Sequence, residues 1–281
     1  MRIWQLPKRL RRLGHISYNR LFSLAIAAGA IPSHQDYTRY VIVGQSRCGS
    51  NFLRGLLNSH PGIIAYGELF RRYGELNWGL PQYPATRRQL ALIRRDPVAF
   101  LEQEVFQRYP RHIRAVGFKL FYYHAANPEW QSVWRYLQER RDIRVIHLRR
   151  RNMLQTLVSR RIANLTQQWS LGNPHGRPLE AGPIRLDYND CLRRFNINQR
   201  WERETAERFR NRPMIEIVYE DLARNYQGTL QHLQRFLGVE ENSVTPQTRK
   251  QMRKPLAEQI ANYAELKARF HGTPWAAFFD E

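Results

Sequence analysis

The segment from residue 40 to residue 57 constrains this chain most, because it joins a buried strand to a helix through a short glycine-bounded loop. A β-branched run at 40–43 precedes the loop 44–49, and the apolar residues that follow have the spacing of one helix face. In such a unit the N–H groups of the loop and of the first helical turn point at one spot, where the helix dipole adds positive charge. The segment therefore predicts an anion-binding site at the end of a buried strand.

The loop lacks the lysine of a nucleotide kinase. Gly44 and Gly49 have the separation of the Walker A motif, but Ser50 and Asn51 stand where that motif has Lys followed by Ser or Thr. Arg47 supplies the fixed cation instead, and its planar guanidinium can hold two oxygens of a phosphate or sulfate group at once. We therefore expect an anionic ligand other than ATP. A P-loop-type kinase stays an alternative, which turnover of Mg-ATP would support.

A second strand–helix unit begins with clustered arginine. Residues 143–148 are typical of a buried strand, and the residues after it have helical spacing. Arg149, Arg150 and Arg151 meet at the helix start, where their charges repel one another and oppose the helix dipole, so that a bound anion would relieve both costs. Ser159 lies about 12 Å further along the helix axis, and a forward-folded Arg151 could partly close this gap. The pair is predicted to hold one phosphate, with a solvated basic helix start as the alternative.

These two motifs resemble those of the sulfotransferases that use 3′-phosphoadenosine-5′-phosphosulfate (PAPS). In that family an Arg-x-Gly-Ser/Thr loop after a buried strand binds the 5′-phosphosulfate, and an Arg at a strand end with a Ser eight residues later binds the 3′-phosphate. Arg47 to Ser50 match the first pattern, and Arg151 with Ser159 matches the second. Cys48 departs from the Ser that more often stands between the Arg and the Gly of the loop, which leaves its hydrogen-bonding role open.

Further local matches narrow the resemblance to bacterial carbohydrate sulfotransferases. Residues 58–62 and 67–70, the strand 116–120 and the tail 254–279 look like the nodulation-factor sulfotransferases and, more distantly, the trehalose sulfotransferases. The resemblance covers the chain from residue 41 to the C-terminus. It implies an enzyme that transfers a sulfuryl group from PAPS to a hydroxyl of a carbohydrate or glycolipid acceptor by in-line displacement, with no metal.

The resemblance and the chemistry of the residues together give a set of site residues. Glu68 is expected to be the general base, since a carboxylate serves at the corresponding Gly-Glu position of the trehalose enzymes, and His124 is the rival base. Lys119 is an ammonium in an otherwise buried strand, and with Arg47 it is expected to stabilise the transferring sulfuryl group. The residues expected to bind PAPS are Arg47, Cys48, Gly49, Ser50, Asn51, Phe52, Arg151, Ser159 and Lys254. Only the resemblance suggests Lys254.

Each of these residues also has a structural alternative. Glu68 could be a charge partner for Arg71 and Arg72, His124 a hydrogen-bonded structural residue, and Lys119 a member of a salt bridge at a strand end. Two loops are candidates for acceptor binding because they are rich in Gly, Pro or aromatic residues. They are residues 66–84, which include Trp78, and residues 169–183.

The composition favours an anionic partner. The formal net charge is +21 and the pI is near 10.7, and of 45 basic residues only five are lysine. Arginine suits the recognition of oxyanions, although the surface arginines can also reflect compositional bias. A basic nucleic-acid- or membrane-binding protein without catalysis is the second alternative. No zinc-finger, helix-turn-helix or RNP pattern is evident, so no specific nucleic acid is expected.

Residues 1–32 differ from the rest of the chain. A basic stretch precedes an apolar run at 21–31, which is too short to span a bilayer as a helix and has an unconvincing cleavage site for a signal peptide. A helix packed on the domain and a basic amphipathic helix in peripheral contact with an anionic membrane both stay open. Cys48 and Cys191 have no spacing typical of zinc or of a disulfide framework, so a cytoplasmic location is expected.

The periodicity predicts one α/β domain at 33–281, with a P-loop-type central parallel sheet flanked by helices on both faces. Ligands should then sit at the carboxyl ends of the strands. Strands are predicted at 40–44, 113–121, 143–148 and 214–219. Helices are predicted at 50–59, 128–140, 151–165, 187–209, 226–237 and near 256–270.

Overall fold

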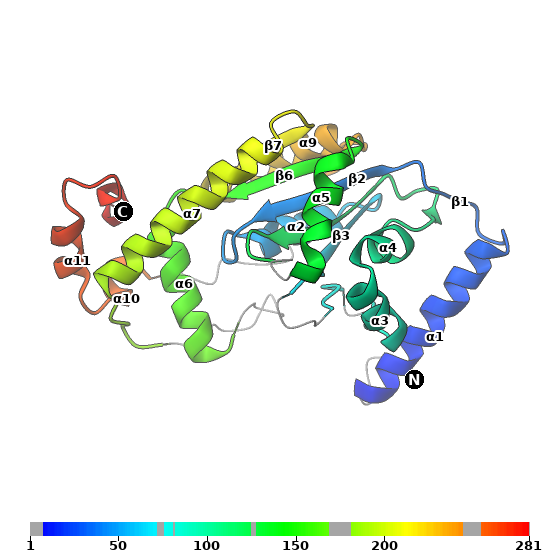
Figure 1. Cartoon of the computed structure of the whole chain (residues 1–281), viewed down its shortest axis with the longest axis horizontal. Coiled ribbons are helices and arrows are strands. Elements are labelled where there is room, and N and C mark those ends of the chain that lie inside the picture. Colours follow the sequence, from blue (N-terminus) through cyan, green and yellow to red (C-terminus); the bar gives the residue numbers. More distant parts are fainter. Residues whose placement is uncertain are drawn as a thin grey trace.

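Five parallel strands form the centre of the protein, in the order β3-β5-β2-β6-β7 (Figure 1). The computed structural model describes residues 8–71, 76–80, 82–124, 128–168, 181–243 and 254–280. The strands are β2 (Thr38–Gly44), β3 (Ile63–Glu68), β5 (Ala115–Phe121), β6 (Ile143–Arg149) and β7 (Met214–Val218). Every residue of β5 is buried, as is typical of a parallel strand covered on both sides.

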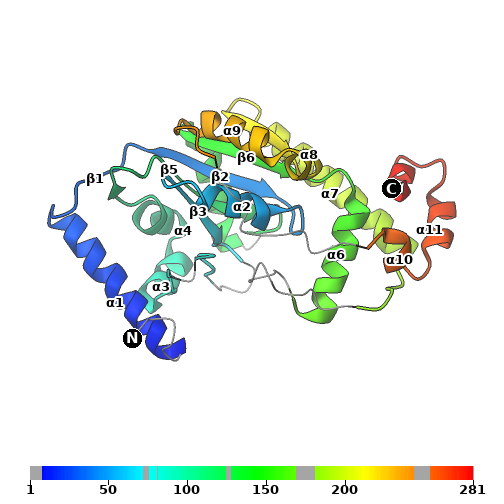
Figure 2. The ribbon, with the colours of Figure 1, turned by 180° about the vertical axis from the view of Figure 1, so that it is seen from behind.

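Helices cover both faces of this sheet. The first face packs on α3 (Arg87–Arg95), α4 (Pro97–Phe100), the π-helical turn η2 (Leu101–Val105) and α5 (Gln131–Glu139), through a core that includes Phe100, Val133 and Phe118. The second face packs on α2 (Ser50–Asn58), α8 (Tyr219–Arg224) and α9 (Tyr226–Leu237), through a core that includes Leu53, Leu222 and Leu233. Figure 1 shows α5 in front of the sheet, and Figure 2 shows α2, α8 and α9 in front of it from behind. The expected fold class is confirmed.

A third apolar cluster lies at one end of the molecule. It joins α6 (Met153–Thr166), α7 (Tyr188–Arg208), α10 (Leu256–Gln259), α11 (Tyr263–Phe270) and the short η4 (Ala276–Phe279). Phe195, Phe270 and Phe279 are almost fully buried in it. The C-terminal segment thereby packs against α6, the helix that carries Ser159.

The opposite end of the molecule is formed by α1 (Lys8–Ala27), which lies beside α3 in both views (Figures 1 and 2). The chain then enters the short strand β1 (Ser33–His34), which pairs antiparallel with β4 (Tyr109–Pro110). No helix in the described part of the chain is long and apolar enough to cross a membrane. The division of the chain at residue 32 stays a prediction, and residues 1–7 lie outside the described residues.

The predicted strands and helices all occur, with bounds that shift by one or two residues at most of their ends. The predicted helix at 128–140 is the short η3 (Pro128–Trp130) followed by α5, and the terminal segment is split into α10 and α11. Sequence periodicity missed β3, which is only six residues long and contains Gly67. It also missed α3, in which only Leu92 and Ile93 are buried.

The parallel arrangement brings the ends of four neighbouring strands to one edge of the sheet. The loop 45–49 follows β2, Glu68 ends β3, Lys119 lies two residues before the end of β5, and Arg149 ends β6. This is the edge at which ligands are expected in an open α/β sheet.

Candidate active site

The loop after β2 has two residues in the left-handed region. Gly49 precedes α2 with φ 89°, and Arg47 has φ 67° although it is not glycine. A Cβ atom on Gly49 would lie 2.1 Å from the Tyr219 ring, so both the backbone conformation and the close approach of α8 require glycine here. The strained loop leaves the free N–H groups of the first turn of α2 at the edge of the sheet.

A lysine reaches the loop from the neighbouring strand. Lys119 on β5 is 1% exposed, and its Nζ donates to Asn51 Oδ1 at 2.7 Å, to Glu68 Oε1 at 3.3 Å and to Ser50 Oγ at 3.4 Å. Burial lowers the pKa of Lys119, and the Glu68 carboxylate opposes this shift. An ammonium therefore lies directly beside the anion-binding turn, in the region that the Walker lysine serves in kinases.

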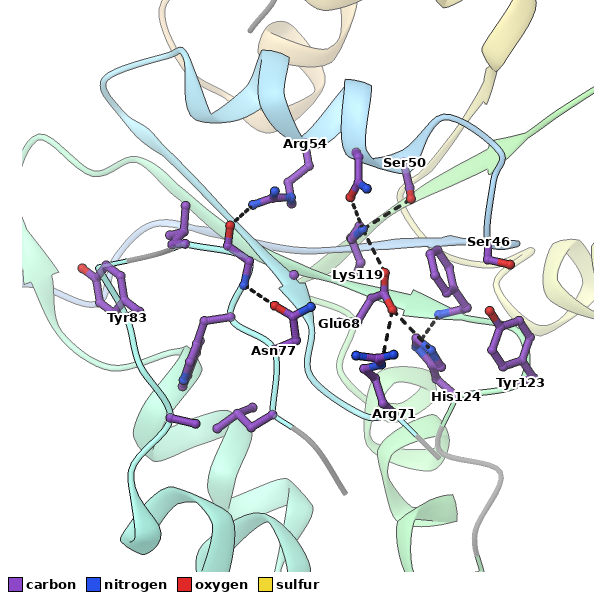
Figure 3. A pocket seen from close by; sticks show the side chains of 18 of the residues that line it. Ser46, Ser50, Arg54, Glu68, Arg71, Asn77, Tyr83, Lys119, Tyr123 and His124 are labelled. Carbon is purple, nitrogen blue, oxygen red and sulfur yellow. Dashed lines mark hydrogen bonds and ion pairs between the residues drawn. The ribbon is translucent and has the colours of Figure 1, made fainter. Parts of the chain in front are cut away.

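Glu68 is placed by strand pairing. It is the register partner of Lys119 across β3 and β5, after an irregularity in the pairing. The segment 76–80 returns to the end of β3, where Gly67 N donates to Trp78 O at 2.7 Å and Asn77 N donates to Glu68 O at 3.3 Å. The Glu68 carboxylate is 23% exposed, and its Oε2 lies 3.8 Å from Arg71 Nε (Figure 3). A partly exposed carboxylate thus borders both the buried ammonium and the solvent.

His124 faces Glu68 but is oriented as a donor. The backbone N–H of Phe121 donates to His124 Nδ1 at 3.2 Å, so in the neutral ring the proton is on Nε2. Nε2 lies 4.0 Å from Glu68 Oε2 (Figure 3). Burial lowers the pKa of His124 to about 4, so the ring is neutral at physiological pH. With Nδ1 engaged and Nε2 protonated, the ring has no free lone pair, and this arrangement favours Glu68 over His124 as the base.

Arg47 connects the loop to α6. Its Nε donates to Ser159 Oγ at 2.9 Å, and Ser159 is 6% exposed. Arg150 lies behind the loop, 8% exposed, and donates through Nη1 to the Arg47 carbonyl at 2.9 Å and through Nη2 to Gln155 Oε1 at 2.6 Å. Its guanidinium also lies 4.8 Å from the centre of the Tyr219 ring. The two expected anion subsites are therefore in direct contact.

Arg151 is not brought to Ser159. Its side chain is 56% exposed and forms a two-pronged pair with Asp221, at 3.0 Å and 2.5 Å. In this structure a carboxylate near the start of α8 therefore holds Arg151 at the surface, and the expectation that Arg151 and Ser159 together bind one phosphate stays a prediction. The residues that the sequence missed are Arg150 and Tyr219. The Arg149–Arg151 run could have indicated Arg150, but nothing in a linear sequence places Tyr219 at the loop.

Three further residues that are expected to bind PAPS are Cys48, Phe52 and Lys254, and the structure places them in different surroundings. Cys48 is 1% exposed, and burial raises the pKa of its thiol to about 11, so only its backbone can face a ligand. Phe52 packs on the second core of the sheet. Lys254 is exposed beside α10, and its carbonyl accepts from Gln259 Nε2 at 2.5 Å.

A cavity of about 1110 Å³ lies beside the loop after β2, the end of β3 and the segment 76–80. Figure 3 shows it from the loop residue Ser46 to Tyr83. Its described lining includes Arg47, Ser50, Asn51, Glu68, Lys119 and His124, together with Tyr123, Arg160, Arg54, Leu80, Tyr83, Leu90 and Arg94. Among the described residues, no three His, Cys, Asp or Glu side chains gather in a way that could hold a metal ion.

The two loops expected to bind an acceptor are only partly described. Residues 72–75 and 81 of the first and 169–180 of the second lie outside the described residues. Trp78 reaches the cavity but is 4% exposed, with its ring 4.7 Å from that of Tyr66 and 5.7 Å from that of Phe100. Its main contribution is to the core, so Tyr83 and Tyr123 are the more accessible rings of the cavity.

Comparison with known proteins gives a family and several relatives. The model of the Sulfotransferase family matches residues 40–243. Nodulation protein H of Rhizobium tropici is 28% identical over 260 residues, which cover 89% of this chain and 95% of the relative. Nodulation protein H of Rhizobium meliloti (strain 1021) is 27% identical over 250 residues, which cover 86% of this chain and 94% of the relative.

Solved structures with lower similarity also match. A sulfotransferase from Alicyclobacillus acidocaldarius is 17% identical with a TM-score of 0.49, over 86% of this chain and 93% of that one. The sulfotransferase domain of the olefin synthase from Synechococcus PCC 7002 is 20% identical with a TM-score of 0.44, over 89% of each chain. At these TM-scores the solved structures add nothing to the family match.

We predict that His124 makes the stability of the protein depend on pH. Burial lowers the pKa values of His124 and His147 to about 4, below the value of about 6.5 in an unfolded chain. The corresponding stability is fully present above pH 6.5 and is lost as the pH falls toward 4, because the unfolded chain then binds protons that the folded protein refuses. As the pH falls from 6.5 to 4, the unfolding free energy of His124→Gln should decrease less steeply than that of the unchanged protein, by up to about 1.4 kcal/mol per pH unit.

Urea unfolding at a series of pH values measures this effect. The matched control is His232→Gln, since His232 is exposed on α9. Superimposable pH profiles for His124→Gln and the unchanged protein would show that the His124 ring is not held neutral by burial.

Proposed function

The chain belongs to the sulfotransferase family, whose members transfer a sulfuryl group from PAPS, and we propose that the cavity performs this transfer to a carbohydrate hydroxyl with Glu68 as general base. The observation that carries the proposal is the contact of Glu68, Lys119 and the anion-binding loop within one cavity. A P-loop-type kinase and a protein without catalysis explain neither the family match nor this arrangement.

The donor subsite is proposed to consist of the loop 47–52, Lys119 and Ser159. PAPS supplies the activated sulfuryl group, and its phosphates suit the residues present. Backbone N–H groups at the start of α2 and the Arg47 guanidinium offer donors to the 5′ end. The Ser159 hydroxyl, which Arg47 already contacts, offers a donor to the 3′-phosphate. Arg150 supports this subsite from behind. Arg151 and Lys254 do not line the cavity in this structure, and their contact with PAPS stays a prediction.

Glu68 is proposed to take the proton of the acceptor hydroxyl. Its carboxylate is the only acid among the described residues that line the cavity, and it is partly exposed to the acceptor side. Lys119 lies 3.3 Å away and keeps positive charge beside the position where negative charge develops. His124 Nε2 lies 4.0 Å from the carboxylate, which is too long for a hydrogen bond. Glu68 and Lys119 thus divide the proton transfer and the charge stabilisation between them.

We predict that loss of Arg47 weakens the binding of adenosine 3′,5′-bisphosphate, the product left by PAPS, by about 10- to 100-fold. The reason is that a charge-assisted hydrogen bond to the ligand contributes about 1.5–3 kcal/mol. Calorimetric titration of Arg47→Ala at near-physiological salt measures the loss. Arg151→Ala is the matched control, because Asp221 holds Arg151 at the surface. A larger loss of affinity in Arg151→Ala than in Arg47→Ala would show that Arg151 binds the 3′-phosphate.

We predict that Glu68→Gln lowers kcat by about 10²–10⁴-fold, because a positioned general base contributes that much to a proton transfer. Its affinity for adenosine 3′,5′-bisphosphate should stay near that of the unchanged protein, since the donor subsite is intact. Transfer of radiolabelled sulfate from PAPS to a panel of saccharides measures kcat. Retained turnover in Glu68→Gln, with loss in His124→Asn, would make His124 the base.

We further propose that the acceptor is a glycolipid and that α1 contacts the membrane that holds it. Tyr18, Leu21 and Leu24 on α1 are 65%, 67% and 64% exposed, and their spacing of three residues puts them on one face of the helix. The sequence adds four basic residues in the first turns of α1 and Arg20 near its middle. Asn19 Nδ2 donates to Gln82 O at 2.8 Å, next to Tyr83 of the cavity. Apolar and basic residues on one helix are suited to an anionic lipid surface.

We predict that the protein binds vesicles of phosphatidylcholine with phosphatidylserine through α1. The double change Leu21→Glu and Leu24→Glu should abolish most of this binding, because it puts carboxylates on the face that would enter the lipid. Co-sedimentation measures binding, and Leu165→Glu is the matched control, since Leu165 is 67% exposed on α6. Equal vesicle binding by the double variant and by Leu165→Glu would show that α1 does not contact the membrane.

A further inference from the structure

The cavity is lined by two further arginines that lie outside the proposed donor subsite. Arg54 of α2 and Arg94 of α3 both line the cavity, and neither belongs to the donor subsite. Figure 3 shows Arg54 and Tyr83 on one side of Glu68, with the loop residue Ser46 on the other. These two arginines therefore border the space in which an acceptor would lie.

The carboxylate of the cavity cannot balance these charges. Glu68 is the one acid in the described lining, and its two oxygens already face Lys119 at 3.3 Å and Arg71 at 3.8 Å. Burial and then the positive charge of Arg54 both lower the pKa of Lys119, with Glu68 opposing them. Arg54 thus repels the Lys119 ammonium, which already shares the Glu68 carboxylate with Arg71. A further anion in the cavity would offset this repulsion.

Arg54 is held in place without being neutralised. Its Nη1 donates to the Gly79 carbonyl at 2.7 Å, and Gly79 has φ 71°. A Cβ atom at Gly79 would lie 2.8 Å from Nη1, so glycine is needed for this close approach. Its Nε is buried and has no hydrogen-bond partner among the described residues. A carbonyl satisfies one N–H group but leaves the charge in place. Burial lowers the pKa of Arg54, and the Glu68 carboxylate opposes this shift without cancelling it.

Arg94 extends the positive charge to the rim of the cavity. It is exposed in the last turn of α3, and no described carboxylate pairs with it. Arg95, the next residue, is also exposed but is not among the described lining residues. Arg94 and Arg95 both lie in the last turn of α3, but only Arg94 is among the described residues that line the cavity.

We propose that the acceptor saccharide carries an anionic group, a carboxylate or a phosphate, that binds to the arginines Arg54 and Arg94 of the cavity lining while its hydroxyl lies at Glu68. The inference rests on the proposed sulfotransferase function and specifies the chemical class of the acceptor. Positive charge at the mouth of a cavity also raises the local concentration of an anionic substrate.

Matched saccharides test this proposal. Three disaccharides are compared that differ in one of their two sugars. This sugar is a neutral hexose in the first, the corresponding hexuronic acid in the second and the hexose 6-phosphate in the third. Calorimetry measures their binding to the full chain saturated with adenosine 3′,5′-bisphosphate at low salt. At least one anionic member should bind about fivefold more tightly than the neutral one, the upper range for a partly exposed ion pair. Comparing the uronate with the phosphate identifies the anionic group.

Two charge reversals locate the effect. Arg94→Glu should remove the preference for the anionic member, whereas Arg95→Glu should keep it, and both should bind adenosine 3′,5′-bisphosphate as before. Equal binding of all three disaccharides by the unchanged protein, no measurable binding of any, or equal effects of the two reversals would overturn the inference. Failure of the donor product to bind would instead contradict the proposed function, so the two failures are distinguishable.

Discussion

The buried ammonium of Lys119 is the constraint on which the proposed active site depends. An ammonium that is 1% exposed is costly unless hydrogen-bond acceptors surround it. Its acceptors are Ser50 and Asn51 at the start of α2 and Glu68 at the end of β3. One side chain on the central strand pair thereby fixes the position of the anion-binding turn and of the proposed base. Glu68 is the charged partner among these three acceptors, and Ser50 and Asn51 are neutral.

The donor loop is held by a second set of contacts. Arg47 and Gly49 both have left-handed backbone conformations, and the surrounding structure must stabilise them. Arg150 donates to the Arg47 carbonyl, and the Tyr219 ring packs where a side chain at position 49 would lie. The hydrogen bond from Arg47 to Ser159 then joins the loop to α6. The two proposed anion subsites are thus joined by a hydrogen bond in this structure.

Local patterns predicted much of the fold, because long buried strands and amphipathic helices have strong periodicity. The strand–loop–helix unit at 38–58 and the unit at 143–166 were both recognisable in this way. The strand β3 was not, since Gly67 interrupts a short apolar run, and α3 buries only two residues. The separation of Arg151 from Ser159 was also beyond the sequence, because it depends on Asp221, which is seventy residues away along the chain.

The sequence by itself determined the chemistry that this protein offers: a loop with Arg47 in place of the kinase lysine, a Ser eight residues after Arg151, and a lysine within a buried strand. Only the tertiary structure decided which of these groups meet. Lys119 reaches the loop because β5 pairs with β2 in parallel, and Glu68 faces Lys119 because β3 pairs with β5. The physical reason is that strand order and register are set by packing of the whole sheet, whereas residue type and local spacing are properties of short segments.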